Sequence, residues 1–256
     1  MTGAAPRFAI VAPMRNEAGA APALAAEIGA ACAALGPFEA IFVDDGSDDA
    51  TPEVLANLRA RHPWLRTLRH AESCGQSAAV ATGVRAARAP LICTIDGDGQ
   101  NPPAEIPKLL APLMAADRPD RLALICGVRR ERRDVAARRA ASRGANALRR
   151  WLLKDDAPDS GCGLKAFPRD VYLTLPYFDH MHRYLPSLFL REGLEIAHVD
   201  VAHRARESGR TKYTNVGRAL VGALDLFGVW WLMRRRRPPH VLPEAAAAPD
   251  PTAPPA

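Results

Sequence analysis

The stretch Leu91-Ile-Cys-Thr-Ile-Asp-Gly-Asp-Gly-Gln-Asn-Pro-Pro103 joins a short apolar run to a turn that carries two carboxylates. The run Leu91–Ile95 is typical of a strand buried on both faces, because it lacks the polar alternation of a half-exposed strand. The chain then changes at once to Asp96, Gly97 and Asp98. This combination predicts a buried strand whose carboxyl end bears an acidic, glycine-containing turn.

Similar apolar runs on both sides of this stretch predict the rest of the sheet. Between the first two, Leu24, Ile28, Cys32 and Leu35 recur at helical spacing. An alternation of strands and helices predicts an α/β fold, with a mainly parallel sheet covered by helices on both faces. The other predicted strands are Phe8–Ala12, Phe38–Val43, Leu122–Cys126 and, later in the chain, a run from Ile196 to His203.

Polar residues follow two of these strands at the positions where a ligand would bind. Pro13-Met-Arg-Asn-Glu17 comes after the first strand, and Asp44-Asp-Gly-Ser-Asp48 comes after the second. Ligands of mainly parallel sheets bind at the carboxyl ends of the strands. Three such ends that carry carboxylates form an acidic pocket, which needs a cation or several hydrogen-bond donors to be stable.

Asp96 and Asp98 are candidate ligands of Mg²⁺ or Mn²⁺. Hard divalent cations prefer oxygen ligands, and Gly97 allows the backbone to approach a diphosphate closely. Such an ion would stabilise the charge on a departing nucleotide, and Gln100 is near enough to join it. A solvated acidic turn is the alternative for an isolated Asp-x-Asp pair. The position after an apolar strand, beside other acidic strand ends, favours the metal.

Two further segments have two interpretations each. Asp44 and Asp45 can accept hydrogen bonds from a nucleoside base and ribose, or can form an Asx-type turn before a helix that begins near Pro52. One aspartate can also cap the turn while the other binds. Gly75 and Gln76 open a helix of small residues, which either directs backbone donors to a phosphate or packs closely against its neighbours.

Basic residues concentrate in Arg129–Arg150, which contains nine arginines. Helical spacing places Arg138, Ser142 and Asn146 on one face, and guanidinium groups match phosphate oxygens well. A protein that binds nucleic acid or another anionic surface is the alternative. That alternative predicts interleaved aromatic residues, whereas Trp151 is the one aromatic residue nearby. A discrete phosphate ligand, and not nucleic acid, is therefore the favoured partner.

The C-terminal part predicts attachment to a membrane surface. Ala219–Met233 is apolar except for Asp225, and at about 1.5 Å per residue it would be about 22 Å long, short of the hydrocarbon core of about 30 Å. Its tryptophans precede four arginines, which together supply four of the net +6 charges. This predicts a helix lying in the interface, with a helix buried in the core as the alternative. We expect a catalytic domain over 1–214, a membrane-associating helix over 215–237 and a disordered Pro/Ala-rich tail over 238–256.

Length and cysteine content indicate the size of the domain and the compartment of the protein. The 256 residues suffice for one α/β domain with short appendages. Five cysteines without a Cys-x-x-Cys pair are typical of reduced thiols. Because no secretory signal precedes Phe8, we expect the catalytic part at the cytoplasmic face of a membrane, peripheral or shallowly inserted, with oligomerisation as an aid to insertion.

Together these segments resemble glycosyltransferase family 2, and within it the dolichyl-phosphate mannosyltransferases and bacterial polyisoprenyl-phosphate glycosyltransferases. The resemblance implies a GT-A fold and transfer of a hexose, with mannose favoured, to a polyisoprenyl phosphate. It also implies a nucleotide-sugar donor, GDP-mannose or a UDP-sugar. The matching segments are Val11–Glu17, Val43–Ser47, Asp96–Pro103, Ser142–Asn146, Asp159–Lys165 and the spaced residues His203, Arg206, Gly209, Lys212 and Tyr213.

The resemblance assigns a role to each matching position, and two departures from the family pattern qualify it. Arg15 stands where many relatives carry an aromatic residue, which leaves the nucleotide open, and Gly99 replaces a bulkier residue, which loosens the pocket. The implied roles are the nucleoside for Pro13, Arg15, Glu17, Asp44 and Asp45; the metal and diphosphate for Asp96, Asp98 and Gln100; the acceptor phosphate for Arg129, Arg138 and Ser142; and a loop closing over the donor for Arg206 and Lys212. The residues themselves add Gly75, Gln76 and Gly97 as candidates for binding the donor.

A phosphate acceptor needs little help from a base, because it is already charged at pH 7. We therefore expect a single displacement with inversion at the anomeric carbon, with Asp159 as the base if one assists, or as part of a structural turn. A hydroxyl acceptor on a glycan or glycolipid is the alternative, and it would make Asp159 indispensable. A protein that only binds anionic surfaces would keep its binding after Asp98→Asn.

Overall fold

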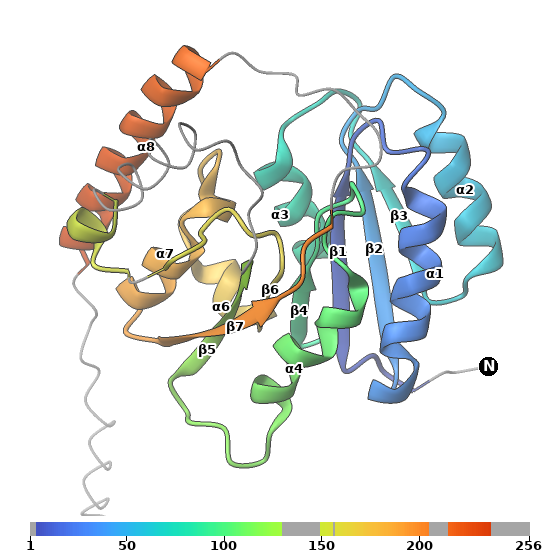
Figure 1. Ribbon diagram of the computed structural model, residues 1–256, viewed down its shortest axis with the longest axis horizontal. Helices are drawn as coiled ribbons and strands as arrows, with labels where there is room; N and C mark the ends of the chain where they lie inside the picture. Colours follow the sequence, from blue (N-terminus) through green and yellow to red (C-terminus); the bar gives the residue numbers. More distant parts are fainter. Residues whose placement is uncertain (1–3, 130–148, 156, 205–214, 237–256) are drawn as a thin grey trace, which may run out of the picture.

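A seven-stranded sheet forms the centre of the molecule, with the strand order β3-β2-β1-β4-β6-β5-β7 (Figure 1). The computed structural model describes residues 4–129, 149–155, 157–204 and 215–236. The pairs β1–β2, β2–β3, β1–β4 and β5–β7 are parallel, and β6 is antiparallel to β4 and β5. The strands are β1 (Phe8–Met14), β2 (Phe38–Asp44), β3 (Leu65–Arg69), β4 (Leu91–Thr94), β5 (Leu122–Arg129), β6 (Lys165–Pro168) and β7 (Glu195–Val201).

Helices cover both faces of the sheet, as an α/β fold requires (Figure 1). Along β1, Phe8 and Ile10 pack into the core under α1, α2 and α4, whereas Ala9 and Val11 pack against α3 on the other face. The predicted three-layer arrangement is therefore confirmed. The helices are α1 (Ala21–Cys32), η1 (Ala33–Leu35), α2 (Thr51–Arg61), α3 (Gln76–Ala86), η2 (Pro103–Glu105), α4 (Ile106–Met114), α6 (Arg169–Thr174), η3 (Met181–Arg183), α7 (Leu185–Arg191) and α8 (Asn215–Arg234).

The five predicted strands all occur, but β3 and β6 were not predicted. β3 lies at the edge of the sheet and contains Arg66 and Arg69, so it lacks a continuous apolar run. β6 has four residues and begins with Lys165, a buried lysine. Both strands are too short and too polar for hydrophobic pattern alone to reveal.

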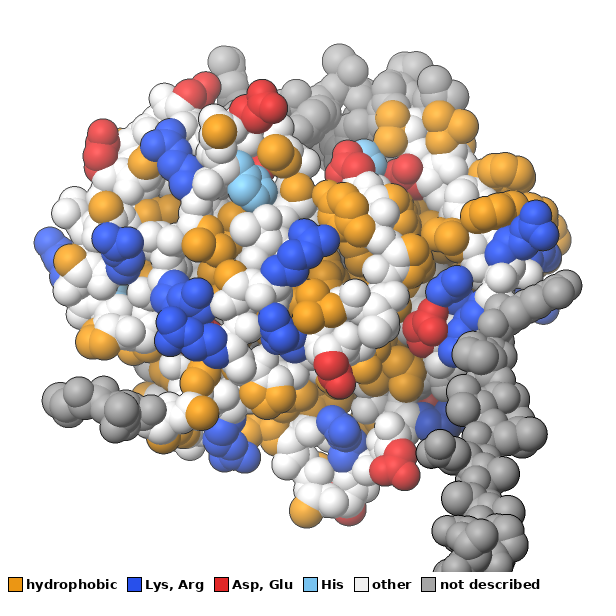
Figure 2. Space-filling model, turned by 180° about the vertical axis from the view of Figure 1, so that it is seen from behind, with side chains coloured by type: hydrophobic (Ala, Val, Ile, Leu, Met, Phe, Trp, Pro, Cys, Tyr) orange, Lys and Arg blue, Asp and Glu red, His pale blue; other side chains and the backbone are white. Residues whose placement is uncertain are grey.

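Helix α8 has 20 residues and lies against α7 at one end of the molecule (Figure 1). Val229 is buried with Leu153 and Tyr184, so one side of α8 packs on the domain. Its other side exposes large apolar residues, and Figure 2 shows hydrophobic side chains gathered on this part of the surface with Lys and Arg side chains beside them. Among the described helices, none has the length and hydrophobicity needed to cross a membrane. The exposed residues are Val221 (41%), Leu224 (65%), Phe227 (61%) and Trp231 (47%).

Candidate active site

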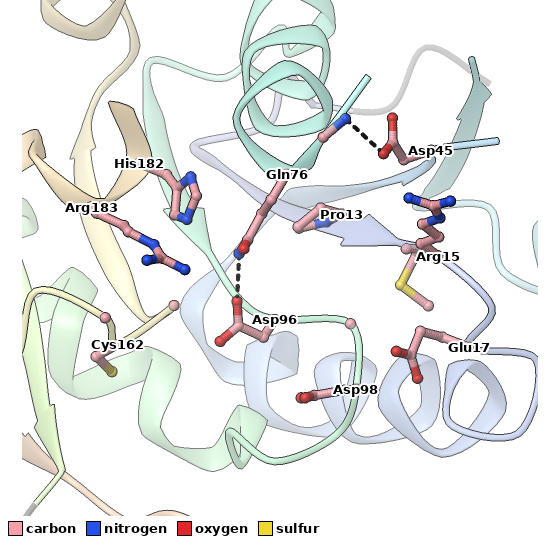
Figure 3. A pocket seen from close by; sticks show the side chains of 15 residues that line it. Pro13, Arg15, Glu17, Asp45, Gln76, Asp96, Asp98, Cys162, His182 and Arg183 are labelled. Atoms are coloured by element: carbon pink, nitrogen blue, oxygen red, sulfur yellow. Dashed lines mark hydrogen bonds between the residues drawn. The ribbon is translucent and has the colours of Figure 1, made fainter. Parts of the chain in front are cut away.

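A pocket of about 440 Å³ opens at the carboxyl ends of β1, β2 and β4 (Figure 3). Nine residues predicted from the sequence line it, which confirms that the three polar strand ends converge. They are Pro13, Arg15, Glu17, Asp45, Gly75, Gln76, Asp96, Gly97 and Asp98. The remaining lining residues are Met14, Gly161, Cys162, Gly163, His182 and Arg183.

Two side-chain amides hold the Asp96 carboxylate in the middle of this pocket. Gln76 Nε2 donates to Oδ1 at 2.9 Å, as Figure 3 shows, and Asn101 Nδ2 donates to Oδ2 at 2.9 Å. Burial raises the pKa of Asp96, the nearby Asp98 raises it further, and the positive charge of Lys165 opposes both effects. The site thus orients a carboxylate whose charge the neighbouring groups only partly offset.

Glycines allow the backbone to approach Asp96 and β1 closely. A Cβ atom added to Gly163 would lie 2.3 Å from the Asp96 carboxyl group. A Cβ atom added to Gly97 would lie 2.5 Å from Met14 Sδ and from the Pro13 carbonyl oxygen. Since real Cβ atoms do not tolerate such distances, both positions require glycine for the pocket to keep its shape.

The residues at the centre of the pocket fit a hard divalent cation. Asp96 and Asp98 both line the pocket and supply the carboxylate oxygens that Mg²⁺ and Mn²⁺ prefer. Gln100 does not line it: its backbone N–H donates to Asp98 Oδ1 at 3.2 Å, and its side-chain amide donates to the Arg204 carbonyl oxygen at 3.4 Å. Gln100 as a metal ligand therefore stays a prediction.

Asp45 forms four hydrogen bonds at the edge of the pocket. Its Oδ1 accepts from His70 Nδ1 and the Cys74 N–H, both at 2.8 Å, and its Oδ2 accepts from the Ser73 hydroxyl at 2.8 Å and the Gly75 N–H at 2.9 Å. Burial acts to raise the pKa of Asp45, but these hydrogen bonds together lower it below 3.8. Asp45 therefore orders the loop that leads into α3.

The potential ligand atoms of Asp45, His70 and Cys74 lie within 4.8 Å of one another. The chain's own groups already use this cluster, since His70 Nε2 also lies 3.0 Å from the Thr82 hydroxyl. We therefore assign the cluster to hydrogen bonding, and Asp96 and Asp98 stay the predicted metal ligands.

Asp44 has a different role from its neighbour. Its side chain is 2% exposed and is not part of the pocket lining. Oδ1 accepts a hydrogen bond from the Ser47 N–H at 3.0 Å, and Oδ2 lies 3.1 Å from Arg69 Nε. The turn interpretation thus describes Asp44, and the structure brings only Asp45 to the pocket.

Hydrogen bonds connect the loop after β1 to the segment after β2. The backbone N–H of Asn16 donates to the Ser47 hydroxyl at 2.9 Å, and that of Glu17 donates to the Thr51 hydroxyl at 2.9 Å. Arg15 reaches across to the Ser73 hydroxyl. These contacts place Arg15 and Glu17 on the same wall of the pocket as Asp45 (Figure 3).

Arg129 and Asp159 form a bidentate ion pair beside the pocket. Arg129 Nε and Nη2 donate to the two Asp159 carboxylate oxygens at 2.7 and 2.8 Å. Burial opposes the charge on Arg129, yet the Asp159 carboxylate raises its pKa. Neither side chain lines the pocket, so their roles toward an acceptor stay predictions. The predicted site residues Arg138, Ser142, Arg206 and Lys212 lie outside the described residues.

His182 and Arg183 were not predicted, although they form one wall of the pocket. They belong to η3, which follows α6 and does not directly follow a strand or a recognised motif. Cys162 and Gly163 lie in a segment whose resemblance to the family was noted, but no role was assigned to them. Only the fold reveals these contributions.

Comparison with known proteins identifies the family. A model of "Glycosyl transferase family 2" matches residues 9–175. The dodecaprenyl-phosphate galacturonate synthase of Rhizobium johnstonii is 33% identical over 91% of this chain and 69% of its own length. The undecaprenyl-phosphate 4-deoxy-4-formamido-L-arabinose transferase of Pectobacterium carotovorum is 34% identical over 80% of this chain and 62% of its own length. The chain thus spans about two thirds of the length of these relatives.

Solved structures agree with the fold at low sequence identity. Glucosyl-3-phosphoglycerate synthase of Mycobacterium tuberculosis, solved with Mg²⁺ and UDP, has a TM-score of 0.65 at 16% identity, over 90% of this chain and 79% of that one. Mannosyl-3-phosphoglycerate synthase of Rubrobacter xylanophilus has a TM-score of 0.66 at 16% identity, over 90% and 74%. The fold is therefore of the GT-A type, and the chain belongs to glycosyltransferase family 2.

Proposed function

We propose that the protein transfers a sugar from a nucleotide-sugar to a polyisoprenyl phosphate, with inversion at the anomeric carbon and with a divalent cation. The observation that carries the proposal is the pocket itself, where seven other predicted donor-site residues surround Asp96 and Asp98. The acceptor phosphate oxygen forms the new bond to the anomeric carbon. The bond from that carbon to the donor diphosphate breaks, and its electron pair leaves with the nucleoside diphosphate.

Asp96 and Asp98 would hold Mg²⁺ or Mn²⁺, which supplies charge stabilisation for the departing diphosphate. The chain's own part is to orient these carboxylates before the donor arrives. Gln76 and Asn101 fix the two oxygens of Asp96, and the loop after β1 supplies Arg15 and Glu17 for the nucleoside. Such preorganisation lowers the barrier because no group has to reorient during the reaction.

A phosphate acceptor is supported by the relatives and by the pairing of Asp159. Both curated relatives are named for transfer to, or synthesis of, a polyprenyl-phosphate sugar. A hydroxyl acceptor would need a general base, and the base candidate Asp159 is engaged on both oxygens by Arg129. A phosphate monoester arrives already ionised, so it can react without that base.

The nucleotide of the donor has two candidates, GDP and UDP. Mannose from GDP-mannose was favoured by the resemblance, whereas the relatives are named for galacturonate and 4-deoxy-4-formamido-L-arabinose. Solved structures of one neighbour, the glucosyl-3-phosphoglycerate synthase, contain UDP or UDP-glucose. We therefore propose a UDP-sugar as the first donor to test, with GDP-mannose beside it.

We further propose that α8 attaches the enzyme to the cytoplasmic face of a membrane. Its exposed apolar residues recur at intervals of three or four, so they form one stripe along the helix. Arg234 and Arg235 lie over Trp230 and Trp231 at the end of that helix, at 4.0 and 5.4 Å from the ring centroids. Aromatic and basic groups in this arrangement suit the interface of an anionic membrane. All five cysteines are free thiols, which fits a reducing compartment.

The proposal is tested by incubating the purified protein with undecaprenyl phosphate or dolichyl phosphate and a panel of radiolabelled nucleotide-sugars. We expect one donor to give a labelled lipid with Mn²⁺ or Mg²⁺ and none with EDTA. The product's anomeric configuration should be opposite to that of the donor. Label transferred to a glycan hydroxyl instead of the lipid phosphate would contradict the proposal.

A further inference from the structure

The two walls of the pocket differ in a way that assigns a place to the transferred sugar. Arg15, Glu17 and Asp45 stand on one wall, and His182 and Arg183 stand on the opposite wall (Figure 3). Asp96 lies between them. A nucleotide-sugar is a linear molecule with the diphosphate in its middle. If the diphosphate lies at Asp96 and the nucleoside at the first wall, the sugar lies against His182.

Ser77 fixes the orientation of the His182 ring. Ser77 Oγ lies 2.7 Å from His182 Nδ1, and it accepts a hydrogen bond from the backbone N–H of His182 at 3.3 Å. Ser77 is fully buried near the start of α3. Because Ser77 Oγ already accepts from the backbone N–H of His182, we assign the Ser77 hydroxyl proton to the contact with Nδ1. A neutral ring that accepts at Nδ1 carries its own proton on Nε2.

The surroundings of His182 keep the ring neutral. Burial lowers its pKa well below 6.5, and the positive charges of Lys165 and Arg183 lower it further. A neutral imidazole adds no charge to the pocket, and it offers one directed N–H donor. That is a group suited to a sugar oxygen, whereas a diphosphate is better matched by a cation or an arginine.

We propose that His182 is a specificity-determining residue that donates from Nε2 to an oxygen of the transferred sugar, and that Ser77 is its positioning residue. The inference rests on the proposed function, because it needs a nucleotide-sugar in the pocket. Binding sites that hydrogen-bond a substrate group discriminate strongly against ligands that lack it, because the buried donor is then left unpaired.

The test compares binding of nucleoside diphosphates with binding of their sugar conjugates. The full chain, with Mn²⁺, is titrated calorimetrically with UDP, GDP, UDP-glucose, UDP-galacturonic acid and GDP-mannose. In the wild type we expect one sugar conjugate to bind more tightly than its nucleoside diphosphate. His182→Ala should weaken binding of that conjugate about tenfold or more, and it should change the affinity for the nucleoside diphosphate by less than about twofold.

Two further variants separate recognition from a structural effect. His182→Gln carries an amide N–H donor and should recover part of the lost affinity, and Ser77→Ala should give an intermediate loss because the ring is no longer held. Glu17→Gln, on the opposite wall, should weaken binding of the nucleoside diphosphate and of its sugar conjugate equally. Thermal unfolding of each variant reports whether the fold is intact.

The outcomes distinguish this inference from the proposed function. If the His182 variants keep the wild-type ratio between conjugate and diphosphate affinities while sugar transfer proceeds, His182 does not recognise the sugar and the proposed function stands. His182 likewise does not recognise the sugar if the wild type binds the nucleoside diphosphate and its sugar conjugate equally and still transfers the sugar. If the wild type binds none of the nucleotides, both the inference and the proposed function fail.

Discussion

Asp96 shows how much of the site depends on single contacts. Gln76 and Asn101 each donate to one of its oxygens. The positive charge of Lys165 acts to lower the pKa of Asp96, and Lys165 Nζ donates to the Ser160 and Cys162 carbonyl oxygens. The same lysine therefore holds the turn that carries Gly163 against Asp96. A change at any of these residues should displace the carboxylate of Asp96, which we propose as one of the two metal ligands.

Gly163→Ala should reduce metal-dependent transfer at least about tenfold, because its Cβ would lie 2.3 Å from the Asp96 carboxyl group and push it aside. The matched control is Gly161→Ala, whose Cβ would meet Arg129 Nη2 at an ordinary 3.5 Å. Initial rates at saturating donor and Mn²⁺ give the comparison. Equal rates for the two variants would show that the close approach at Gly163 does not matter.

Asp45→Asn should lower the free energy of unfolding by about 2 kcal/mol at pH 7, because an amide NH₂ would face donors where a carboxylate accepted four hydrogen bonds. The pKa of Asp45 is lowered in the folded protein, so its contribution is present above pH 3.8 and is lost as the pH falls through the folded-state pKa. The difference between wild type and variant should therefore shrink below about pH 3.8.

Urea unfolding between pH 7 and pH 3 checks this expectation. Asp170→Asn is the control, because Asp170 is exposed on α6 and its carboxylate accepts from the neighbouring Val171 N–H. We expect that control to stay within about 0.5 kcal/mol of the wild type. A difference for Asp45→Asn that is constant across the pH range would contradict the assigned role of its charge.

Single residues also mark the limit of what the sequence predicted. Asp45, Asp96 and Asp98 could be placed in one pocket because each follows a strongly apolar strand. Which of Asp44 and Asp45 faces the pocket could not be decided, because adjacent residues differ only in the direction of their side chains. His182 could not be found at all, since its partner Ser77 is 105 positions away.

At the scale of elements, η3 connects the pocket with α8. His180 Nδ1 lies 3.0 Å from Asp225 Oδ2, and the Tyr184 hydroxyl donates to the Gly222 carbonyl oxygen at 3.4 Å. These two residues flank His182 and Arg183 on either side. The wall of the pocket that we assign to the sugar is therefore held at both ends by the helix that we assign to the membrane.

The double variant Leu224→Ser with Phe227→Ser should bind anionic lipid vesicles at least about tenfold more weakly, because each apolar side chain contributes about 1.5–3 kcal/mol when it leaves water. Leu224 and Phe227 are 65% and 61% exposed, so the fold should tolerate the change. Sedimentation with vesicles of mixed phosphatidylglycerol and phosphatidylcholine gives the partition coefficient. Raised salt should weaken wild-type binding through its arginines.

Leu173→Ser is the control for this experiment, since Leu173 is 40% exposed on α6, away from the stripe on α8. Equal vesicle binding by wild type and double variant would remove the membrane role of α8.

The elements themselves were predictable to different degrees. Long apolar strands such as β1 and β2 stood out because they are buried on both faces. The short strand β6 was hidden, although it lies between β4 and β5 in the sheet. For α8 the sequence left a surface helix and a core helix open, and the structure shows one packed side and one exposed side.

At the scale of the whole molecule, the sheet order brings distant segments to one pocket. The parallel half, β3-β2-β1-β4, contributes Asp96 and the wall that we assign to the nucleoside, and the segments around β6 contribute Gly163 and His182. The ends of parallel strands follow a general rule, so the first half of the site could be predicted. The second half depends on the antiparallel insertion of β6, a strand that the hydrophobic pattern does not predict.

The central claim is that Asp96 and Asp98 hold a divalent cation against a nucleoside diphosphate. Its most direct test is an electron paramagnetic resonance titration of Mn²⁺ into the protein, with and without UDP or GDP. We predict that one nucleotide strengthens Mn²⁺ binding to the wild type, and that Asp98→Asn weakens it at least about tenfold, whereas Asp170→Asn leaves it unchanged. Undiminished Mn²⁺ binding by Asp98→Asn in the presence of that nucleotide would contradict the account.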